Sequence, residues 1–258
     1  MDDIKVIVAT HKKYQMPESS MYLPVQVGAE GKEDLGYAKD NTGDNISSKN
    51  PYFCELTGLY WAWKNLDSDY IGLAHYRRHF CLKNKSKNEF DNILTYEETE
   101  KILENTDVIL PKKRNYVIEN LYSHYEHTMY VEPLDETGKI IQNKYPEYAQ
   151  EFEKLHKRTS AHMFNMFIMK KEIFQDYCKW LFDILFELEK NIDSSMYDKF
   201  HARFYGRISE LLLDVYLQKN NISYKEVNFI YMEKINKFQK IKGFLEAKFG
   251  GKKYGRSF

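Results

Sequence analysis

The residues best suited to chemistry lie at the end of one apolar stretch, in the segment Tyr70-Ile-Gly-Leu-Ala-His-Tyr-Arg-Arg-His-Phe80. An apolar strand that leads straight into a basic cluster is hard to explain by packing alone. Adjacent arginines such as Arg77 and Arg78 can hold a diphosphate through paired hydrogen bonds and stabilise charge on a departing nucleotide. The spacing therefore predicts an anion-binding site, with an ordinary surface pair making salt bridges as the alternative.

Histidines are the second chemical feature, because imidazole can bind a metal, move a proton or donate a hydrogen bond to a sugar hydroxyl. His124 and His127 are three residues apart and share one face if their segment is helical. The chain has neither a His-Glu-x-x-His motif nor a cysteine pair at metal-binding spacing. A metal-dependent phosphoesterase or sugar-nucleotide hydrolase remains an alternative function, and it would use four histidines: His75, His79, His124 and His127.

A carboxylate, Glu210, follows the basic segment Arg203-Phe-Tyr-Gly-Arg207. We expect it in the first turn of a helix over residues 208–219, where a negative charge complements the helix dipole. The same carboxylate, facing a substrate, could instead take the proton from an acceptor hydroxyl. Both interpretations remain open at the level of sequence.

The elements that must position these residues alternate between strands and helices, which predicts an α/β fold with a central, mostly parallel sheet flanked by helices. Ligands of such sheets bind beyond the carboxyl ends of the strands, where Thr10, His11 and the 75–79 cluster lie. Residues 12–50 form a long polar stretch, typical of a functional or disordered loop. The expected strands are 4–9, 69–76, 107–111, 164–169 and 225–233, and the expected helices are 52–65, 96–105, 136–143, 146–157, 172–189 and 208–219.

The length of 258 residues suits one large domain, which we place at 1–233, with a tail at 234–258. The tail holds seven Lys and one Arg against one Glu, a net charge of +7, so the remaining residues carry 30 basic and 37 acidic side chains. Apolar residues are interleaved with its charges, which is typical of a segment attracted to an anionic membrane surface. A solvated helix that packs on its own domain is the alternative.

Several function classes are disfavoured by what the sequence lacks. There is no Walker glycine loop, no Gly-x-Gly-x-x-Gly and no Gly-x-Ser-x-Gly elbow. An acidic body would repel nucleic acid. The absence of a leader, of a long apolar run and of paired cysteines leads us to expect a cytoplasmic protein, peripheral on the inner membrane at most. Aromatic residues make up 16% of the chain, which fits an aromatic core or, as a third hypothesis, a non-catalytic carbohydrate-binding module.

Five blocks of the sequence, in order, resemble one known family: Asp44-Asn-Ile-Ser, Asn50-Pro-Tyr-Phe-Cys-Glu-Leu-Thr-Gly-Leu-Tyr-Trp-Ala-Trp-Lys-Asn65, the 70–80 segment, His162-Met-Phe-Asn-Met-Phe-Ile-Met169 and Gly206-Arg-Ile-Ser-Glu-Leu-Leu212. They are similar to the bacterial capsular and exopolysaccharide glycosyltransferases long labelled a domain of unknown function, some of which are assigned as β-galactofuranosyltransferases. The similarity spans roughly residues 4 to 232.

This resemblance implies a GT-A-like fold with one nucleotide-binding sheet, and a UDP-sugar donor with galactofuranose as the first sugar to expect. Members of the GT-A class place an Asp-x-Asp metal motif at the end of a central strand. Here the corresponding position reads His75-Tyr76-Arg77. A Mn²⁺ or Mg²⁺ cofactor is therefore not expected, no residue is assigned as a metal ligand, and cationic side chains would take the metal's place.

The resulting hypothesis is inverting transfer, in a single displacement, from the nucleotide sugar to a glycan or lipid-linked acceptor. The expected catalytic residues are Glu210 as base and Arg77 and Arg78 as the diphosphate clamp. The donor nucleotide would contact Thr10, His11, Asp40, Asn41, Asp44, Asn45, His75 and Tyr76. The sugar or acceptor would contact His124, His162, Asn165 and Arg207.

Overall fold

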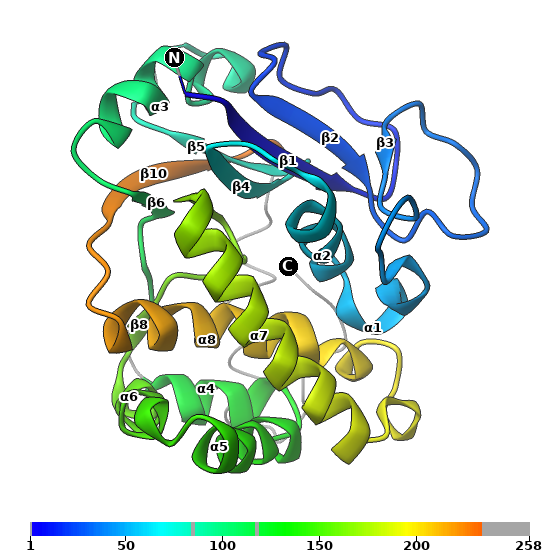
Figure 1. The fold of residues 1–258 in the computed structure, drawn as a ribbon, viewed down its shortest axis with the longest axis vertical. Coiled ribbons are helices and arrows are strands. Elements are labelled where there is room, and N and C mark those ends of the chain that lie inside the picture. The colour runs from blue at the N-terminus through cyan, green and yellow to red at the C-terminus, as the bar shows by residue number, and fades with distance from the viewer. Residues whose placement is uncertain (1, 84–85, 117–118, 234–258) are drawn as a thin grey trace.

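The computed structural model describes residues 2–83, 86–116 and 119–233, and the expected basic tail lies outside these ranges. Figure 1 shows a sheet across the upper half of the molecule, with α7 and α8 beneath it and α4, α5 and α6 at the lower end. The strands of this sheet are β1 (Ile4–Thr10), β2 (Tyr22–Gln26), β3 (Ala38–Lys39), β4 (Tyr70–His75), β5 (Arg78–Cys81), β6 (Val108–Pro111), β9 (Phe167–Lys170) and β10 (Lys225–Tyr231).

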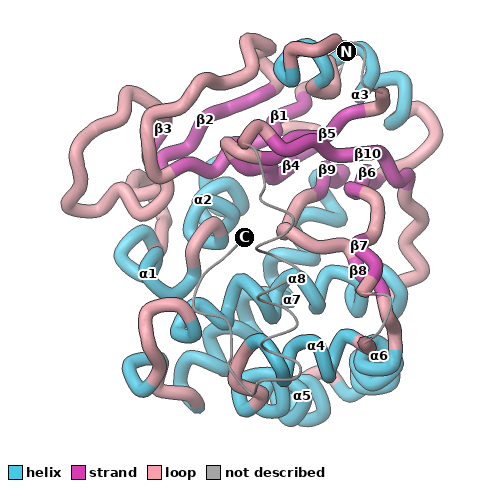
Figure 2. The backbone as a smooth tube through the Cα atoms, turned by 180° about the vertical axis from the view of Figure 1, so that it is seen from behind, coloured by secondary structure: helices cyan, strands magenta, loops and turns pink. Residues whose placement is uncertain are grey.

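The helices are α1 (Asn50–Phe53), α2 (Leu56–Asn65), α3 (Tyr96–Leu103), α4 (Leu121–Thr128), α5 (Glu132–Lys144), α6 (Pro146–Lys157), α7 (Lys171–Asn191) and α8 (Phe204–Lys219). Short 3-10 turns occur at Ser47–Lys49, Glu89–Asn92, Ser194–Met196 and His201–Arg203. A small ribbon of β7 (Arg114–Asn115) and β8 (Ser160–Ala161) lies between the sheet and the helices (Figure 2). Among the described helices, none combines the length and apolarity that a membrane span requires.

The α/β class is confirmed, but the sheet is mixed rather than mostly parallel. Its order is β3-β2-β1-β4-β5-β10-β6-β9, and β9 also pairs with β4. Pairs β1–β2, β2–β3, β1–β4 and β6–β10 are parallel, whereas β4–β5, β5–β10, β4–β9 and β6–β9 are antiparallel. The reason is visible at Tyr76 and Arg77, since a two-residue connection can only join antiparallel strands. The second half of the basic cluster is therefore itself a strand, β5.

The extra β4–β9 pairing folds five strands, β4, β5, β10, β6 and β9, into a partly closed unit. Gly72 makes the close approach of β1, β4 and β9 possible, because it is registered with Val6 on one side and Ile168 on the other. A Cβ at Gly72 would lie 2.7 Å from the carbonyl oxygen of Phe167 and 2.9 Å from Cγ1 of Ile168. Glycine at this position is therefore a packing requirement.

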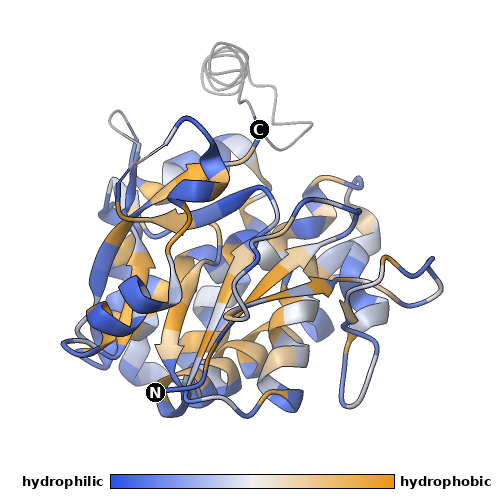
Figure 3. Cartoon of the chain, turned by 90° about the horizontal axis from the view of Figure 1, so that it is seen from above, coloured by the Kyte–Doolittle hydropathy of each residue, from blue (hydrophilic) through white to orange (hydrophobic). Residues whose placement is uncertain are grey.

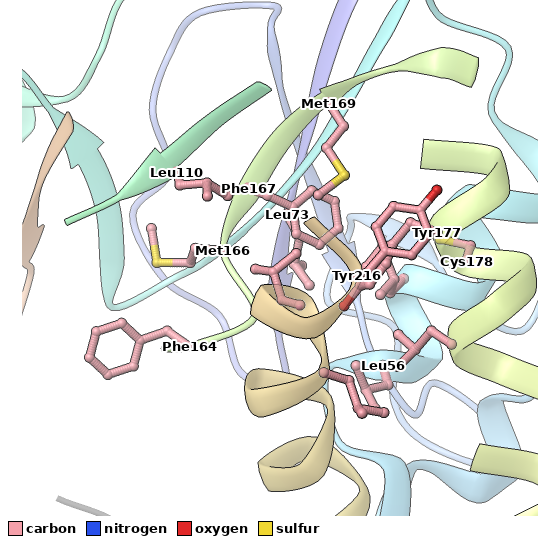
Figure 4. Close-up of a cluster of buried hydrophobic side chains, with 14 of the residues drawn as sticks. Leu56, Leu73, Leu110, Phe164, Met166, Phe167, Met169, Tyr177, Cys178 and Tyr216 are labelled. Carbon is pink, nitrogen blue, oxygen red and sulfur yellow. The ribbon is translucent and has the colours of Figure 1, made fainter. Parts of the chain in front are cut away.

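The core lies between the sheet and the helices. Figure 3 shows apolar residues concentrated in the strands and polar residues on the outer surface. In Figure 4, Leu73 and Phe167 from the sheet meet Tyr177 of α7, Tyr216 of α8 and Leu56 of α2, all buried. Helix α8 is enclosed nearly all round, because every residue from Phe204 to Leu217 except Arg207 is buried. A helix enclosed in this way can hold its side chains in fixed positions at the edge of the sheet.

Several predicted elements need correction. The strand expected at 164–169 begins only at Phe167, and the helix expected at 136–143 begins at Glu132. The helix expected at 52–65 is interrupted at Cys54, whose φ of 54° and ψ of −130° end α1. The side chain of Asn50 donates to the Cys54 carbonyl oxygen at 2.8 Å, which holds this break in place. Helix α8 begins at Phe204, not at 208, so Glu210 lies in its interior and not in its first turn. The 12–50 stretch contains β2 and β3, which Pro24 and their shortness had hidden, and helix α4 was also not predicted.

Candidate active site

The candidate site lies at one edge of the sheet, where segments distant in sequence converge. Strands β1, β4, β6 and β10 all end at this edge, and the antiparallel β5 and β9 begin there. The α1–α2 break and the first turn of α8 face the same edge, because Asn165 bonds to Glu55 and to Gly206. The expectation that the ends of β1 and β4 lie together is confirmed by the pairing of Ala9 with His75.

Asn165 is the junction of this edge. Its Nδ2 donates to Oε1 of Glu55 at 2.8 Å and to the carbonyl oxygen of Gly206 at 3.1 Å, so it joins the α1–α2 break to α8. Its φ is 55°, a left-handed conformation that asparagine tolerates better than most residues. Asn165 is 1% exposed, and its Oδ1 has no hydrogen-bond partner. The structure thus places Asn165 at the centre of the expected site, in contact with protein groups.

Phe164 ties β4 and β5 to the same turn. Its carbonyl oxygen accepts a hydrogen bond of 2.6 Å from Nε2 of His75, and this fixes the proton on Nε2 because a carbonyl can only accept. The guanidinium of Arg78 stacks 4.3 Å from the Phe164 ring centroid and 5.3 Å from that of Tyr231. Phe164 has a φ of 80°, so the two residues of this turn are both left-handed. Strained backbone of this kind is concentrated at functional sites.

Positive charge gathers at this edge. Arg77 is half-buried and Arg78 is 8% exposed, and burial together with the neighbouring Arg77 lowers the pKa of Arg78. The Nε atom of Arg78 is buried without a hydrogen-bond partner. Arg203 donates from Nε to Sγ of Cys54 at 2.8 Å. Burial and then the charges of Lys12, Arg77 and Arg203 lower the pKa of His11, which shows that these cations share one neighbourhood.

Two carboxylates, Glu55 and Glu210, face these cations. Oε2 of Glu210 lies 3.5 Å from Nη1 of Arg207. Burial raises the pKa of Glu210, and the charge of Glu55 raises it further, against the opposing effect of Arg207 and Arg78. Burial would also raise the pKa of Glu55, but His75, the hydrogen bond from Asn165 and Arg203 outweigh it and lower that pKa.

The end of β1 forms an aromatic and cationic margin of the site. The Thr10 hydroxyl donates to the Lys12 carbonyl oxygen at 2.7 Å, which shapes the turn after β1. The exposed ring of His11 meets the edge of Tyr76 at 5.4 Å between centroids. The amine of Lys12 lies 4.9 Å from the Tyr76 centroid and pairs with Glu233 at 2.9 Å. His11 and Tyr76 are thus placed at the expected edge.

The residues expected along the 40–45 loop have their hydrogen-bond partners within residues 26–65. Asp40 is fully buried, and its carboxylate accepts hydrogen bonds from the backbone of Gly28 and Ala29 and from the hydroxyls of Ser47 and Thr57. The other three make these contacts: Asn41 with Glu30, Asp44 with Tyr60, and Asn45 with Gly43 and Ser47. Asp40 reaches the α1–α2 break only indirectly, through the Thr57 hydroxyl that also bonds to the Cys54 carbonyl oxygen. The donor-binding role of this loop stays a prediction.

His162 and His124 are placed differently from one another. His162 is fully buried, with Nδ1 2.5 Å from Oδ1 of Asp214 and Nε2 3.0 Å from Oε1 of Glu226. Both of its ring nitrogens are therefore engaged by protein carboxylates. The ring of His124 lies against that of Tyr116, with the centroids 4.1 Å apart and the planes tilted by 37°. Burial lowers the pKa of His124 to about 4, against the hydrogen bond with Glu119, and the charge of nearby Arg207 contributes to the lowering.

The four histidines of the hydrolase alternative do not form one site. His124 and His127 both bond to Glu119, at 3.1 and 2.7 Å. His79 is fully buried between strands, and burial lowers its pKa to about 3. Across the described ranges, no group of three or more His, Cys, Asp or Glu is arranged to hold a metal ion.

Sequence reasoning missed four residues of this edge: Cys54, Glu55, Phe164 and Arg203. Glu55 was hidden inside the helix expected at 52–65, and only the break at Cys54 turns its side chain towards Asn165. No sequence pattern around Glu55 marks it as a functional residue. The contact between Arg203 and Cys54 spans 149 residues, which no local pattern can indicate.

Comparisons with known proteins identify the family and the fold. Residues 5–221 match the sequence profile of a family described as a domain of unknown function, DUF4422. The chain belongs to the DUF4422 family. No protein of curated function matches it by sequence. Among solved structures, this DUF4422 chain resembles the apo structure of WbbM, a bifunctional glycosyltransferase, with a TM-score of 0.84 and 32% identity over 90% of the chain. It covers 46% of the WbbM chain, so it corresponds to about half of that protein.

Proposed function

We propose that this DUF4422 protein transfers a sugar from a UDP-sugar to a glycan or lipid-linked acceptor in capsule or exopolysaccharide synthesis, with galactofuranose as the first donor sugar to test. The single observation that supports this most is the cationic sheet edge of Arg77, Arg78 and Arg203 beside the carboxylates of Glu55 and Glu210. The shared fold with a glycosyltransferase supports the reaction class.

Arg77 and Arg78 are proposed to bind the diphosphate. Charge develops on the diphosphate as the sugar–phosphate bond breaks, and fixed guanidinium groups in a partly buried setting stabilise that charge strongly. Arg78 suits this role because Phe164 and Tyr231 fix its plane while its Nε lacks a protein partner. A GT-A-like fold implies a divalent metal, but the end of β4 presents His75-Tyr76-Arg77 instead of paired carboxylates, and cationic side chains are proposed to take the place of the metal.

The reaction itself is proposed to be a single displacement with inversion at the anomeric carbon. The donor would lie between the turn after β1, with His11, and the β4–β5 connection, with Tyr76. The acceptor would approach from the side of α8, where Arg207 lies near His124. A carboxylate at this edge is needed to receive the proton of the acceptor hydroxyl.

The test is a panel of UDP-sugars, including UDP-galactofuranose, with alkyl glycosides as acceptors and with or without EDTA. We expect sugar transfer with release of UDP, no loss of rate in EDTA, and about a 100-fold loss in Arg77→Ala or Arg78→Ala. Arg158→Ala is a matched control, since Arg158 pairs with Glu151 on α6. Binding of sugars without release of UDP would favour a carbohydrate-binding module. Unimpaired transfer in both site variants would refute the clamp.

The residues 234–258 are proposed to bring the enzyme to an anionic membrane surface, where lipid-linked acceptors reside. The support is the sequence alone, a net charge of +7 interleaved with apolar residues. We expect the full chain to sediment with vesicles containing phosphatidylglycerol, and residues 1–233 to stay in solution. Equal binding of the two forms, or equal binding to neutral phosphatidylcholine vesicles, would contradict this role.

A further inference from the structure

The two carboxylates of the site are held in different ways. Glu55 is half-buried at the α1–α2 break, whereas Glu210 is 5% exposed within α8. Glu210 has a cation 3.5 Å away, Nη1 of Arg207, and the charges of Arg78 and Arg114 also act on it. A group that must receive a proton from an incoming hydroxyl needs to be reachable by the acceptor, and Glu55 satisfies this condition better.

The side chain of Glu55 is also fixed in direction. Its Oε1 accepts the 2.8 Å hydrogen bond from Asn165, which is itself bonded to the Gly206 carbonyl at 3.1 Å. A Cβ on Gly206 would be 3.7 Å from this oxygen, so the absent side chain leaves the carboxylate close against α8. The break at Cys54, held by Arg203 and Asn50, aims Glu55 at the sheet edge. A catalytic group preorganised by rigid neighbours is what general base catalysis requires.

The surroundings of the two residues shift their pKa values in opposite directions. Glu55 keeps a pKa below its ordinary value, although its burial opposes this, because His75, Asn165 and Arg203 favour the carboxylate. Burial and the charge of Glu55 raise the pKa of Glu210. Paired carboxylates whose environments separate their pKa values commonly have separate roles in catalysis. Of the two carboxylates, Glu55 is the one whose surroundings favour the ionised form, which a proton acceptor needs.

We propose that Glu55, held by Asn165 against Gly206 at the α1–α2 break, is the catalytic base of the sugar transfer. This inference rests on the proposed function. The acceptor oxygen forms a bond to the anomeric carbon, the bond from that carbon to the β-phosphate oxygen breaks, and UDP leaves with its electron pair. The acceptor proton passes to the carboxylate of Glu55. Glu210 is then a positioning residue that orients Arg207.

The test uses the UDP-sugar and alkyl glycoside that give transfer in the panel above. Glu55→Gln keeps the size of the side chain and the oxygen that accepts from Asn165, and we expect it to lower kcat by about 100- to 10,000-fold with UDP affinity unchanged by calorimetry. We expect Glu210→Gln to retain a kcat within about tenfold of wild type, as suits a residue that does not move the proton. Glu189→Gln is the control, because Glu189 pairs with Lys49 at the surface end of α7.

Two further readouts separate a base from a structural role. With Glu55 as base, the acid limb of kcat/KM lies below pH 4.5, the ordinary value for Glu, whereas Glu210 as base would place it above that value. Azide needs no deprotonation, so it should restore UDP release in Glu55→Ala and form the glycosyl azide. If the wild type transfers the sugar, three results would each overturn the assignment of Glu55 and leave the proposed function standing. They are full activity in Glu55→Gln, an acid limb above pH 4.5, and no glycosyl azide from Glu55→Ala. Absence of transfer by the wild type would overturn the proposed function and this inference with it.

Discussion

The hydrogen bonds of Asn165 allow a quantitative test of how the site is held together. Replacing Asn165 with alanine removes the 2.8 Å bond to the Glu55 carboxylate and the 3.1 Å bond to the Gly206 carbonyl. A hydrogen bond to a charged group contributes about 1.5–3 kcal/mol, and one to a neutral group about 1 kcal/mol. Alanine is also strained at a φ of 55°, which costs about 1 kcal/mol. The free energy of unfolding should therefore fall by about 3–5 kcal/mol.

Asn221 provides a matched control within the same chain. Its φ is 52° and the residue is exposed, and among the described residues its hydrogen bond is from its backbone nitrogen to the Gln218 carbonyl oxygen. Asn221→Ala thus measures the strain alone, about 1 kcal/mol. For a chain of this size each kcal/mol shifts Tm by about 2–4 °C. We expect Tm to fall by about 6–20 °C in Asn165→Ala and about 2–4 °C in Asn221→Ala by scanning calorimetry. Equal losses in the two variants would refute the assigned role of Asn165.

Three further predictions concern single positions. Gly72→Ala places a methyl group 2.7 Å from the carbonyl oxygen of Phe167, so we expect the free energy of unfolding to fall by about 1–3 kcal/mol. In Gly206→Ala the nearest atom to the new methyl group is 3.7 Å away. This variant should be neutral or stabilising in the same melting assay. Burial raises the pKa of Cys54 to about 11, so at pH 8 its thiol should react with DTNB only after unfolding, and rapid labelling mapped to it would contradict its placement. Arg78→Lys keeps the charge but loses the stacked plane, and it should lower transfer at least about tenfold without changing the fold by circular dichroism.

Much of the architecture could be predicted because β1, β4 and β6 are continuous apolar runs that sequence patterns identify. The carboxyl end of β4 was correctly recognised as a place where polar groups gather. The direction of β5 was not, because residues 77–79 were interpreted by their charge, whereas the length of the connection after His75 decides the direction. Helix α6 was predicted with its bounds, since Pro146 marks its start and its apolar face has helical period.

The site was harder to predict than the fold, for a physical reason. A polar residue in a loop can bind a ligand or can stabilise the fold through hydrogen bonds within the protein. Its residue type does not show which of these two roles it has. Asp40 and His162, like Arg77, are polar residues close to a strand end, yet their polar side-chain atoms are engaged by other groups of the protein. Glu55 became visible only through a backbone φ at Cys54 that no propensity indicates. Residues that depend on such long-range contacts must be found in three dimensions.

The pairing of β9 with β4 also affects how this protein behaves towards other chains. A sheet normally has two outer strands whose backbone groups can recruit an extended segment from another molecule, which is a route to aggregation. Here Ile168 and Met169 of β9 are hydrogen-bonded to strands on both sides. Within the described part of the sheet, the other outer strand is β3, which is only two residues long. The same contact that brings Asn165 to Glu55 thus leaves little backbone on which a foreign strand could be templated.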